Sequence, residues 1–334
     1  MTAIFMNKLK NMDLINYIKH NIKIKAVDFN IIKPKISKQK AVLMYHGIDL
    51  EENKRYNTRF FSKKHFERHL IYYKKNYNII SLEDFIDNKN CVNDKLNIAI
   101  TFDDGYRNNY LYAFPLLEKY QIPAHFFITG MNNSNINYKI LWSDALEIAS
   151  SVIDKPLNLF GKEFIKEKDK GFRSLKEYIK KYPISGTDAY IEFINVLNIE
   201  SNNIFLNEKY HCYWELMTDE DIKNIYRSQF VKIGSHGFWH NNLASLSYKN
   251  ACQEIEQSKK YLENITQYEI NAIGYPDGSY TKEISSFAYQ IGIKYQCAVE
   301  YKYKEDINNP NITDRIGLYP KASPKYLNYI INES

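Results

Sequence analysis

Thr101-Phe102-Asp103-Asp104-Gly105 follows the apolar run Leu96-Asn97-Ile98-Ala99-Ile100 and places two adjacent carboxylates at the end of a predicted strand. In α/β proteins the carboxyl ends of strands carry the chemistry. Successive side chains of an extended chain point to opposite faces, so both carboxylates reach one site only if the strand ends or bends there. Gly105 allows such a bend. We interpret the pair as one metal ligand beside one free base; a solvated turn is the alternative for these residues taken alone.

A second group of metal-binding residue types follows another predicted strand. Val231-Lys232-Ile233-Gly234-Ser235 runs directly into His236-Gly237-Phe238-Trp239-His240. Two imidazoles four positions apart reach one ion from a single helical turn or a tight loop. Either histidine alone is equally compatible with a hydrogen-bonded core residue. Together with Asp104, however, His236 and His240 supply two nitrogens and one oxygen, the ligand set of an open catalytic zinc site that keeps a solvent position.

These motifs and Gly274-Tyr275-Pro276-Asp277-Gly278 occur in an order that resembles the polysaccharide deacetylases of carbohydrate esterase family four, also called the nodulation-type homology domain. The resemblance spans roughly residues 40 to 320. It implies a deformed, incomplete (β/α) barrel and a metal-dependent carbohydrate de-N-acetylase. It also implies that Asp103 is the general base and that Asp104, His236 and His240 bind a divalent metal, for which we expect Zn2+.

The third motif departs from the family pattern. Its Gly274-Tyr275-Pro276-Asp277 lacks the arginine that commonly orients the base. Arg315, at the end of a later strand, can take this role, although an arginine at a strand end is more often part of a surface ion pair. The resemblance assigns substrate contacts to Tyr275, Pro276 and Asp277, and it assigns binding of the oxyanion to the backbone N–H of Asp277.

Met44-Tyr45-His46-Gly47-Ile48 narrows the resemblance to one branch. Ordinary members take their general acid from a C-terminal Leu-x-x-His motif, but no histidine follows His240 here. The poly-N-acetylglucosamine deacetylases with a permuted motif order carry a Tyr-His segment near the N-terminus instead. This likeness implies that His46 is the general acid. A histidine that only caps the first strand, Ala41 to Tyr45, is the structural alternative.

Apolar runs of strand length alternate with stretches of helical periodicity beyond residue 40. Such alternation predicts an α/β fold with parallel strands and helices outside them. Ser81, Thr218 and Ser247 each precede a helical stretch and are predicted N-caps. With 334 residues and 44% hydrophobic content, the chain has enough material for one large catalytic domain, which we place at residues 41–330.

Residues 131–215 interrupt this alternation. Ordinary family members join the flanking elements more directly, so we interpret the segment as a largely helical insertion on the active-site face. Its aromatic residues are numerous enough to form a small core of their own. A lid or sugar-binding wall is the functional alternative, because sugars stack on aromatic faces. Trp142, in Leu141-Trp142-Ser143-Asp144, is the candidate for a substrate contact.

An N-terminal arm, residues 1–40, mixes lysines with apolar residues. It is interpreted either as a basic amphipathic helix on a membrane surface, which suits an enzyme acting on a lipid-linked sugar, or as a helix packed across the barrel. The sequence shows no signal peptide and no apolar stretch of the roughly 20 residues that a membrane span needs. Four widely spaced cysteines without a C-x-x-C pair are typical of a reduced protein. We expect a cytoplasmic location, with contact to the inner face of the membrane if the arm binds lipid.

The formal net charge of +6 is small for this length. No stripe of basic residues interleaved with stacking aromatics forms a recognisable nucleic-acid module, so we expect no nucleic-acid partner. The expected partner is an N-acetylated sugar in a glycan or a glycan precursor, as in glycan biosynthesis. Two alternatives remain: an O-acetyl esterase that uses the same residues, and a non-catalytic glycan-binding descendant, against which the complete ligand set argues.

Overall fold

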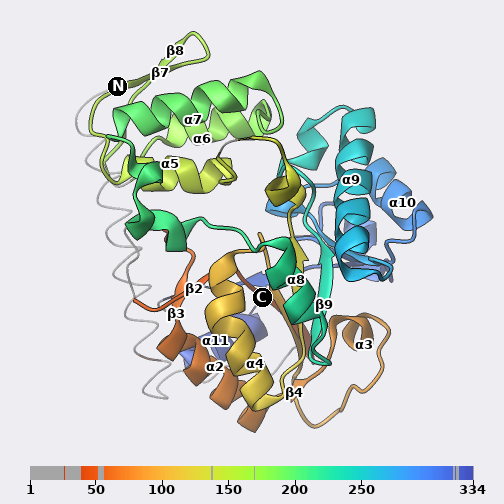
Figure 1. Cartoon of the computed structure of the whole chain (residues 1–334). Helices are drawn as coiled ribbons and strands as arrows, with labels where there is room; N and C mark the ends of the chain where they lie inside the picture. Colours follow the sequence, from red (N-terminus) through yellow and green to blue (C-terminus); the bar gives the residue numbers. More distant parts are fainter. Residues whose placement is uncertain are drawn as a thin grey trace, which may run out of the picture.

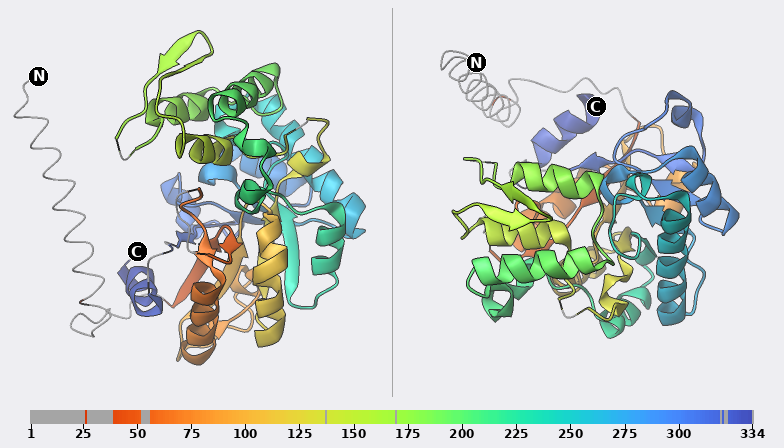
Figure 2. Two further views of the ribbon diagram at one scale, coloured as in Figure 1. Left: turned by 60° about the vertical axis from the view of Figure 1, so that its left-hand side comes forward. Right: turned by 90° about the horizontal axis from the view of Figure 1, so that it is seen from above.

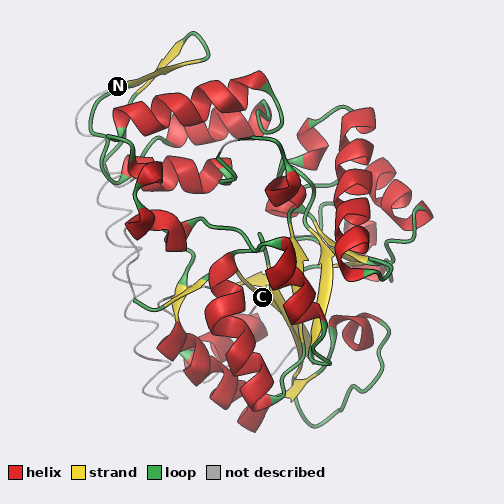
Figure 3. Ribbon diagram, viewed as in Figure 1, coloured by secondary structure: helices red, strands yellow, loops and turns green. Residues whose placement is uncertain are grey.

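The computed structural model describes residue 26 and residues 39–333, apart from positions 52–55, 137, 169, 319, 321 and 322. Its centre is a curled sheet of parallel strands with helices on the outside (Figures 1 and 3). In spatial order the strands are β12 (Ile312–Thr313), β11 (Tyr295–Cys297), β10 (Ala272–Gly274), β9 (Val231–Ser235), β6 (Ala124–Ile128), β5 (Asn97–Phe102), β1 (Lys40–Tyr45) and β13 (Ile316–Gly317). A short strand, β4 (Asn78–Ile79), also pairs with β5.

The two edges of this sheet come together, which makes the sheet an incomplete barrel. β12 and β13 lie at opposite ends of the strand order, yet only Asp314 and Arg315 separate them in the chain. Three peptide steps span at most about 11 Å, so the edges must lie close to each other. The predicted deformed (β/α) barrel is therefore confirmed. Arg315 lies at the seam where the barrel closes.

The central strands are apolar along most of their length because helices cover them. All six residues of β5 are buried, as are five of the six in β1. Continuous apolar runs of this kind are typical of parallel sheets with helices on the outer face. The surrounding helices are α2 (Lys63–Asn76), α3 (Leu82–Ile86), α4 (Phe114–Tyr120), α8 (Asp219–Tyr226), α9 (Tyr248–Thr266), α10 (Lys282–Gln290) and α11 (Pro324–Glu333).

Three predicted helix N-caps are confirmed. The side chain of Ser81 accepts a hydrogen bond from the N–H of Asp84 at the start of α3, and Ser247 accepts one from Asn250 at the start of α9. Thr218 and Asp221 form a reciprocal capping box at the start of α8. These side chains satisfy N–H groups that have no partner inside the helix, so each fixes where its helix begins.

The segment predicted to be an insertion, for which we keep that name, is largely helical and lies over one end of the barrel (Figures 1 and 2). It contains α5 (Trp142–Ser150), α6 (Arg173–Lys181), α7 (Asp188–Glu200) and a hairpin of β7 (Leu157–Leu159) and β8 (Lys162–Phe164). Its buried residues form a core of their own, which extends to Tyr56, Phe60 and Tyr106 of the barrel loops. This joint core fixes the insertion onto the barrel.

The N-terminal arm lies outside the described residues except at positions 26, 39 and 40, so the structure tests neither interpretation of it. A smaller parallel pair, β2 (Ile48–Asp49) and β3 (Phe61–Ser62), follows the first barrel strand. Across the part of the chain that the structure describes, every helix is too short or too polar to cross a bilayer.

Candidate metal and catalytic site

Asp103 and Asp104 lie where β5 ends, and a bend there turns both carboxylates toward one point. The N–H of Asp103 still donates to the carbonyl of Tyr45 (3.0 Å), and the chain then turns through positive φ angles at Asp104 (75°) and Gly105 (81°). A Cβ at Gly105 would lie 2.8 Å from the side chain of Ile128, so both conformation and space require glycine. One oxygen of each carboxylate lies within 4 Å of Nε2 of His236 (3.9 Å from Asp103, 3.2 Å from Asp104).

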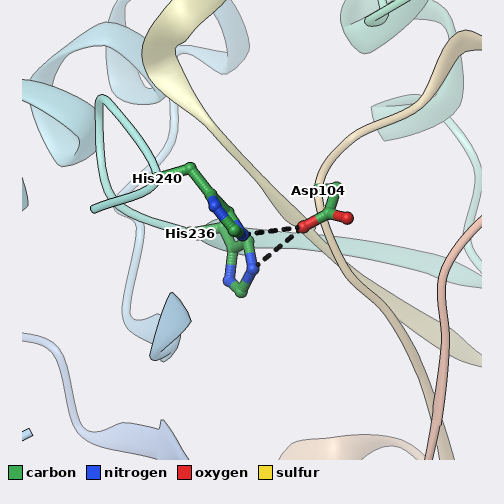
Figure 4. A group of neighbouring side chains, drawn as sticks. All are labelled: Asp104, His236 and His240. Atoms are coloured by element: carbon green, nitrogen blue, oxygen red, sulfur yellow. Dashed lines mark ion pairs between the residues drawn. The ribbon is translucent and has the colours of Figure 1, made fainter. Parts of the chain in front are cut away.

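His236 and His240 lie in a tight loop after β9, and both point toward Asp104 (Figure 4). Nδ1 of His236 is 2.6 Å from the carbonyl oxygen of Gly274, to which it donates, so Nε2 carries the free lone pair. Nε2 of His240 is 3.1 Å from Oδ1 of Asp104. Like Asp104, His240 has a positive φ (56°), which lets two histidines four positions apart converge without a helix.

The three side chains suit a divalent metal. Asp104, His236 and His240 are buried, and each offers one ligand atom within 4.8 Å of the others. Oδ1 of Asp104, the oxygen nearest both imidazoles, is buried without a hydrogen-bond partner among the described residues. Burial opposes the charge of Asp104, but His240 and Arg59 hold its pKa well below the usual value, so it is an ionised carboxylate. Two nitrogens and one carboxylate match the donor set of catalytic zinc sites.

Arg59 binds the other oxygen of Asp104. Its Nη1 donates to Oδ2 of Asp104 at 3.0 Å, while its Nη2 donates to Oδ1 of Asp144 and to the hydroxyl of Tyr106 (2.7 Å). Asp144 is fully buried and also accepts hydrogen bonds from Tyr106 (2.7 Å) and Asn57 (3.0 Å). The insertion thus orients the carboxylate of Asp104 through Asp144 and Arg59.

Asp103 forms a bidentate ion pair with Arg315. Nη1 and Nη2 of Arg315 lie 2.6 and 2.8 Å from the two carboxylate oxygens, and both side chains are buried. Burial raises the pKa of Asp103, but Arg315 and then His236 outweigh this effect and hold it below the ordinary value. Asp103 is therefore an ionised carboxylate of fixed orientation. Arg315 therefore makes the contact with Asp103 that is expected of a substitute for the missing motif arginine. Its part in catalysis stays a prediction.

His46 follows β1 and lines the same cavity as His240 and Asp277. Burial and the nearby Arg59 lower the pKa of His46 to about 4, although Asp104 and Asp103 act in the opposite direction. The imidazole is therefore neutral near pH 7 in the resting protein. A neutral imidazole donates a proton to a leaving amine only after it has gained one, so the acid role predicted for His46 requires a proton transfer during the reaction.

Of the residues predicted to contact substrate, Trp142 and Asp277 line the cavity, whereas Tyr275 and Pro276 do not. Trp142 begins α5 and lines the cavity with 4% of its surface exposed. Asp277 also lines the cavity; its φ is 53°, and its backbone N–H donates to no acceptor in the described chain, so it is free for an oxyanion. Pro276 is buried. The Tyr275 side chain is buried in the core, where its hydroxyl donates to Gln296 at 2.6 Å, so only its backbone remains for the predicted contact.

Glu254 of α9 fixes the loop that carries His240. Its Oε1 accepts a hydrogen bond from Nδ2 of Asn241 (2.7 Å), and its Oε2 accepts one from the N–H of Trp239 (3.3 Å). Burial raises the pKa of Glu254 to about 7 in spite of these donors. Asn241 also donates to the carbonyl of Ser185 at 3.1 Å, so the same loop is joined to the insertion.

The chain belongs to the polysaccharide deacetylase family, whose sequence model matches residues 90–154 and 177–296. YxkH of Bacillus subtilis (strain 168), named for the same family, is 33% identical over 98 residues. That match covers 27% of this chain and 31% of YxkH, so it spans about a third of that protein.

Solved structures share the fold at low sequence identity. The Streptococcus pyogenes deacetylase PplD, determined in complex with acetate, has a TM-score of 0.57 and 17% identity, over 90% of this chain and 99% of PplD. IcaB from Ammonifex degensii has a TM-score of 0.54 and 15% identity, over 88% and 97% of the two chains. A de-N-acetylase from Aggregatibacter actinomycetemcomitans has a TM-score of 0.53 and 16% identity, over 86% and 98%.

Three residues that shape the site were not predicted from the sequence: Arg59, Asp144 and Glu254. Arg59 and Asp144 lie 85 positions apart and meet only because the insertion packs on the barrel loops. Asp144 stands two positions after Trp142, and a carboxylate so close to a predicted substrate contact is a sequence signal for it. Arg59 and Glu254 stand in no motif, and only the fold shows their contacts.

Proposed function

We propose that the protein is a metal-dependent hydrolase that removes N-acetyl groups from an N-acetylhexosamine in a glycan or glycan precursor. The observation that most supports this proposal is the position of Asp103. This carboxylate is held by Arg315 and lies 3.9 Å from a histidine of the Asp104, His236 and His240 cluster. Membership of the polysaccharide deacetylase family agrees with the proposal, as does a fold shared with a deacetylase solved with acetate and with a de-N-acetylase.

In this proposal, Asp104, His236 and His240 hold the metal, for which zinc is the expected ion. When bound, the ion supplies Lewis-acid polarisation of the acetyl carbonyl and of a water molecule. The protein residues supply orientation: Gly274 fixes the tautomer of His236, and Arg59 holds the second oxygen of Asp104.

Hydrolysis adds water across the amide, so one C–O bond forms, the C–N bond breaks, and the products are acetate and an amine. Asp103, ionised and held by Arg315, takes the proton of the attacking water. The free N–H of Asp277 donates to the oxyanion that forms on the acetyl carbon. His46 delivers a proton to the departing nitrogen. Because His46 is neutral at rest, it must first gain the proton that Asp103 has accepted, either directly or through solvent.

The position of His46 at the end of the first barrel strand is the feature that supports placement in the permuted poly-N-acetylglucosamine deacetylase branch. Tyr45 precedes it, and no histidine follows His240 in the sequence. We propose the same boundaries as the sequence indicates, with a catalytic unit of residues 41–330 that carries the insertion of residues 131–215.

We also propose that the enzyme works in the cytoplasm and that its N-terminal arm, residues 1–40, binds the inner face of the membrane, where a lipid-linked sugar would be presented. The lysines and apolar residues of the arm support this proposal. Fractionation of cells that produce the full chain and a chain lacking residues 1–40 tests it. Equal membrane association of the two chains would contradict it.

Simultaneous measurement of acetate and primary amine tests the proposed function. The zinc-loaded protein is incubated with N-acetylglucosamine, chitotetraose and N-acetylglucosamine 1-phosphate, and with an O-acetylated sugar of similar size. Equal release of amine and acetate from an N-acetylated sugar is the expected result. Acetate from the O-acetylated sugar alone would show an esterase, and no release from any of the four would contradict the proposal.

A further inference from the structure

A cavity of about 900 Å³ extends from the catalytic residues to the insertion. His46, His240 and Asp277 line it on the barrel side, and Trp142 and Phe172 are among the residues that line it on the insertion side. The metal site thus opens into a space large enough for more than one sugar unit. The chemistry of the insertion wall should therefore select the substrate.

The wall contributed by the insertion is strongly basic. Seven cationic side chains line the cavity, against four carboxylates. Five of the seven cations come from residues 155–176: Lys166, Lys168, Lys170, Arg173 and Lys176. The match to the family sequence model stops at residue 154 and resumes at residue 177. The basic wall therefore belongs to the part of the insertion that the family model does not match.

Protein carboxylates neutralise only some of these charges. Lys166 pairs with Asp154 at 2.6 Å, and Lys180 pairs with Asp277 at 2.7 Å. Arg173 pairs with a carboxylate of its own helix. By contrast, Lys168, Lys170 and Lys176 form no ion pair within 4 Å in the described chain, and all three side chains are exposed. None of the described carboxylates neutralises these three ammonium groups.

Lys176 lies where positive charges accumulate beside the site. Although its side chain is exposed, the surrounding protein lowers the pKa of Lys176, and the cations Lys180 and Arg59 lower it further, while the carboxylates of Glu147 and Asp277 act in the opposite direction without cancelling the effect. Lys180 contacts Asp277, and Arg59 contacts Asp104, so the two cations that act on Lys176 both contact groups that border the reacting centre. An anion bound here would relieve the mutual repulsion of these cations.

We propose that the substrate is an N-acetylated amino sugar that carries an anionic group, a phosphate or a carboxylate, on or next to the ring that is deacetylated. This inference rests on the proposed function. A polymer of deacetylated amino sugars is cationic and would be repelled by the basic wall, whereas an anionic sugar is attracted and oriented by it. The anion would contact Lys168, Lys170 and Lys176, while the acetamido group faces Asp103.

Binding measurements test this inference without any turnover. The zinc-loaded full chain is titrated with N-acetylglucosamine, N-acetylglucosamine 1-phosphate and N-acetylmuramic acid in an isothermal titration calorimeter. We expect at least one of the two anionic sugars to bind about tenfold more tightly than the neutral one at low salt, with the advantage decreasing as salt is added. Preference for the 1-phosphate or for the muramic acid shows which anion the wall accepts.

Two variants of one helix provide the control. Lys176→Glu should reduce affinity for the preferred anionic sugar about tenfold or more and change affinity for N-acetylglucosamine much less. Lys181→Glu reverses an exposed charge on the same helix, α6, but does not line the cavity, and it should have little effect. Equal affinity for all three sugars, or equal effects of the two variants, would overturn the inference. Failure of every sugar to release acetate would instead overturn the proposed function, because the binding comparison does not depend on hydrolysis.

Discussion

Arg315 donates hydrogen bonds to both carboxylate oxygens of Asp103, although 212 positions separate the two residues in the chain. The contact exists because Arg315 lies between β12 and β13, at the seam where the barrel closes, while Asp103 follows β5. The contact that orients the proposed base therefore forms at the place where the barrel closes. A change that opens the seam should disturb the chemistry as well as the fold.

Replacement of Arg315 should destabilise the protein. Arg315→Met leaves the buried carboxylate of Asp103 without its partner, which typically costs about 3–5 kcal/mol of unfolding free energy. The double variant Arg315→Met/Asp103→Asn removes the unpaired charge and should recover part of that loss. Urea denaturation of the two variants measures the difference. A double variant no more stable than Arg315→Met would show that the ion pair does not explain the cost.

Arg315 should also set the acidic limit of activity. Because the guanidinium lowers the pKa of Asp103, its replacement raises that pKa, and the base becomes protonated at a higher pH. In Arg315→Lys, which cannot form the bidentate pair, the acidic limb of the kcat/KM profile should move to higher pH. An unchanged acidic limb would show that Arg315 does not set the pKa of the base.

Loss of either histidine should remove the metal. His236→Ala and His240→Ala each leave two of three protein ligands, so the purified variants should contain far less than one zinc ion per chain. His211→Ala alters a histidine that packs edge-to-face against Trp214 outside the cluster and serves as the control. Zinc at the wild-type level in both cluster variants would exclude the site.

Arg59 should act through Asp104. Arg59→Met removes the hydrogen bond to Oδ2 of that carboxylate, and comparable outer-shell changes weaken metal affinity about 10- to 100-fold. Competition with a fluorescent zinc chelator measures the affinity, and Arg68→Met on the exposed face of α2 controls for loss of an arginine. Equal zinc affinity in the two variants would mean that Arg59 does not orient the ligand.

Stability should depend on pH through Glu254. Burial raises the pKa of Glu254 from 4.5 to about 7 in the folded state, so the folded protein binds the extra proton between these values. The contribution of Glu254 is therefore most favourable below pH 4.5 and is lost as pH rises through about 7, by an amount on the order of 1 to 3 kcal/mol.

Glu254→Gln imitates the protonated carboxyl and should flatten this dependence in urea denaturation at several pH values. Glu256→Gln, at an exposed position of the same helix, should retain the wild-type dependence. Identical pH profiles for the two variants would contradict the role assigned to burial of Glu254.

The sequence predicts the cluster of Asp104, His236 and His240 for a physical reason. Parallel strands place their carboxyl ends at one edge, so residues that directly follow β5 and β9 must come together there. The parallel strands with helices outside them follow from the alternation of apolar runs and helical periodicity, whereas the incomplete barrel was expected from the resemblance to the family. Arg315 was predicted only through a likeness, because nothing local shows that the strand before it and the strand after it form opposite edges of the sheet.

The insertion could not be predicted in the same detail. Its aromatic residues indicate a core, but they do not indicate which charged residues face the metal site. Asp144 reaches Arg59, and Lys180 reaches Asp277, only because α5 and α6 pack on the barrel loops in one orientation. The net charge of +6 does not indicate the basic wall either, because the wall depends on the positions of the lysines and not on their number.

The central claim is that the adjacent carboxylates Asp103 and Asp104 have different roles, and substitution of each residue tests this claim most directly. Zinc content and acetate release from an N-acetylated sugar are measured on the wild type, Asp103→Asn and Asp104→Asn. We predict that Asp103→Asn retains one zinc ion per chain and loses roughly 10²- to 10⁴-fold in kcat, whereas Asp104→Asn loses the metal and with it the activity. Near wild-type turnover in Asp103→Asn, or full zinc content in Asp104→Asn, would contradict the account.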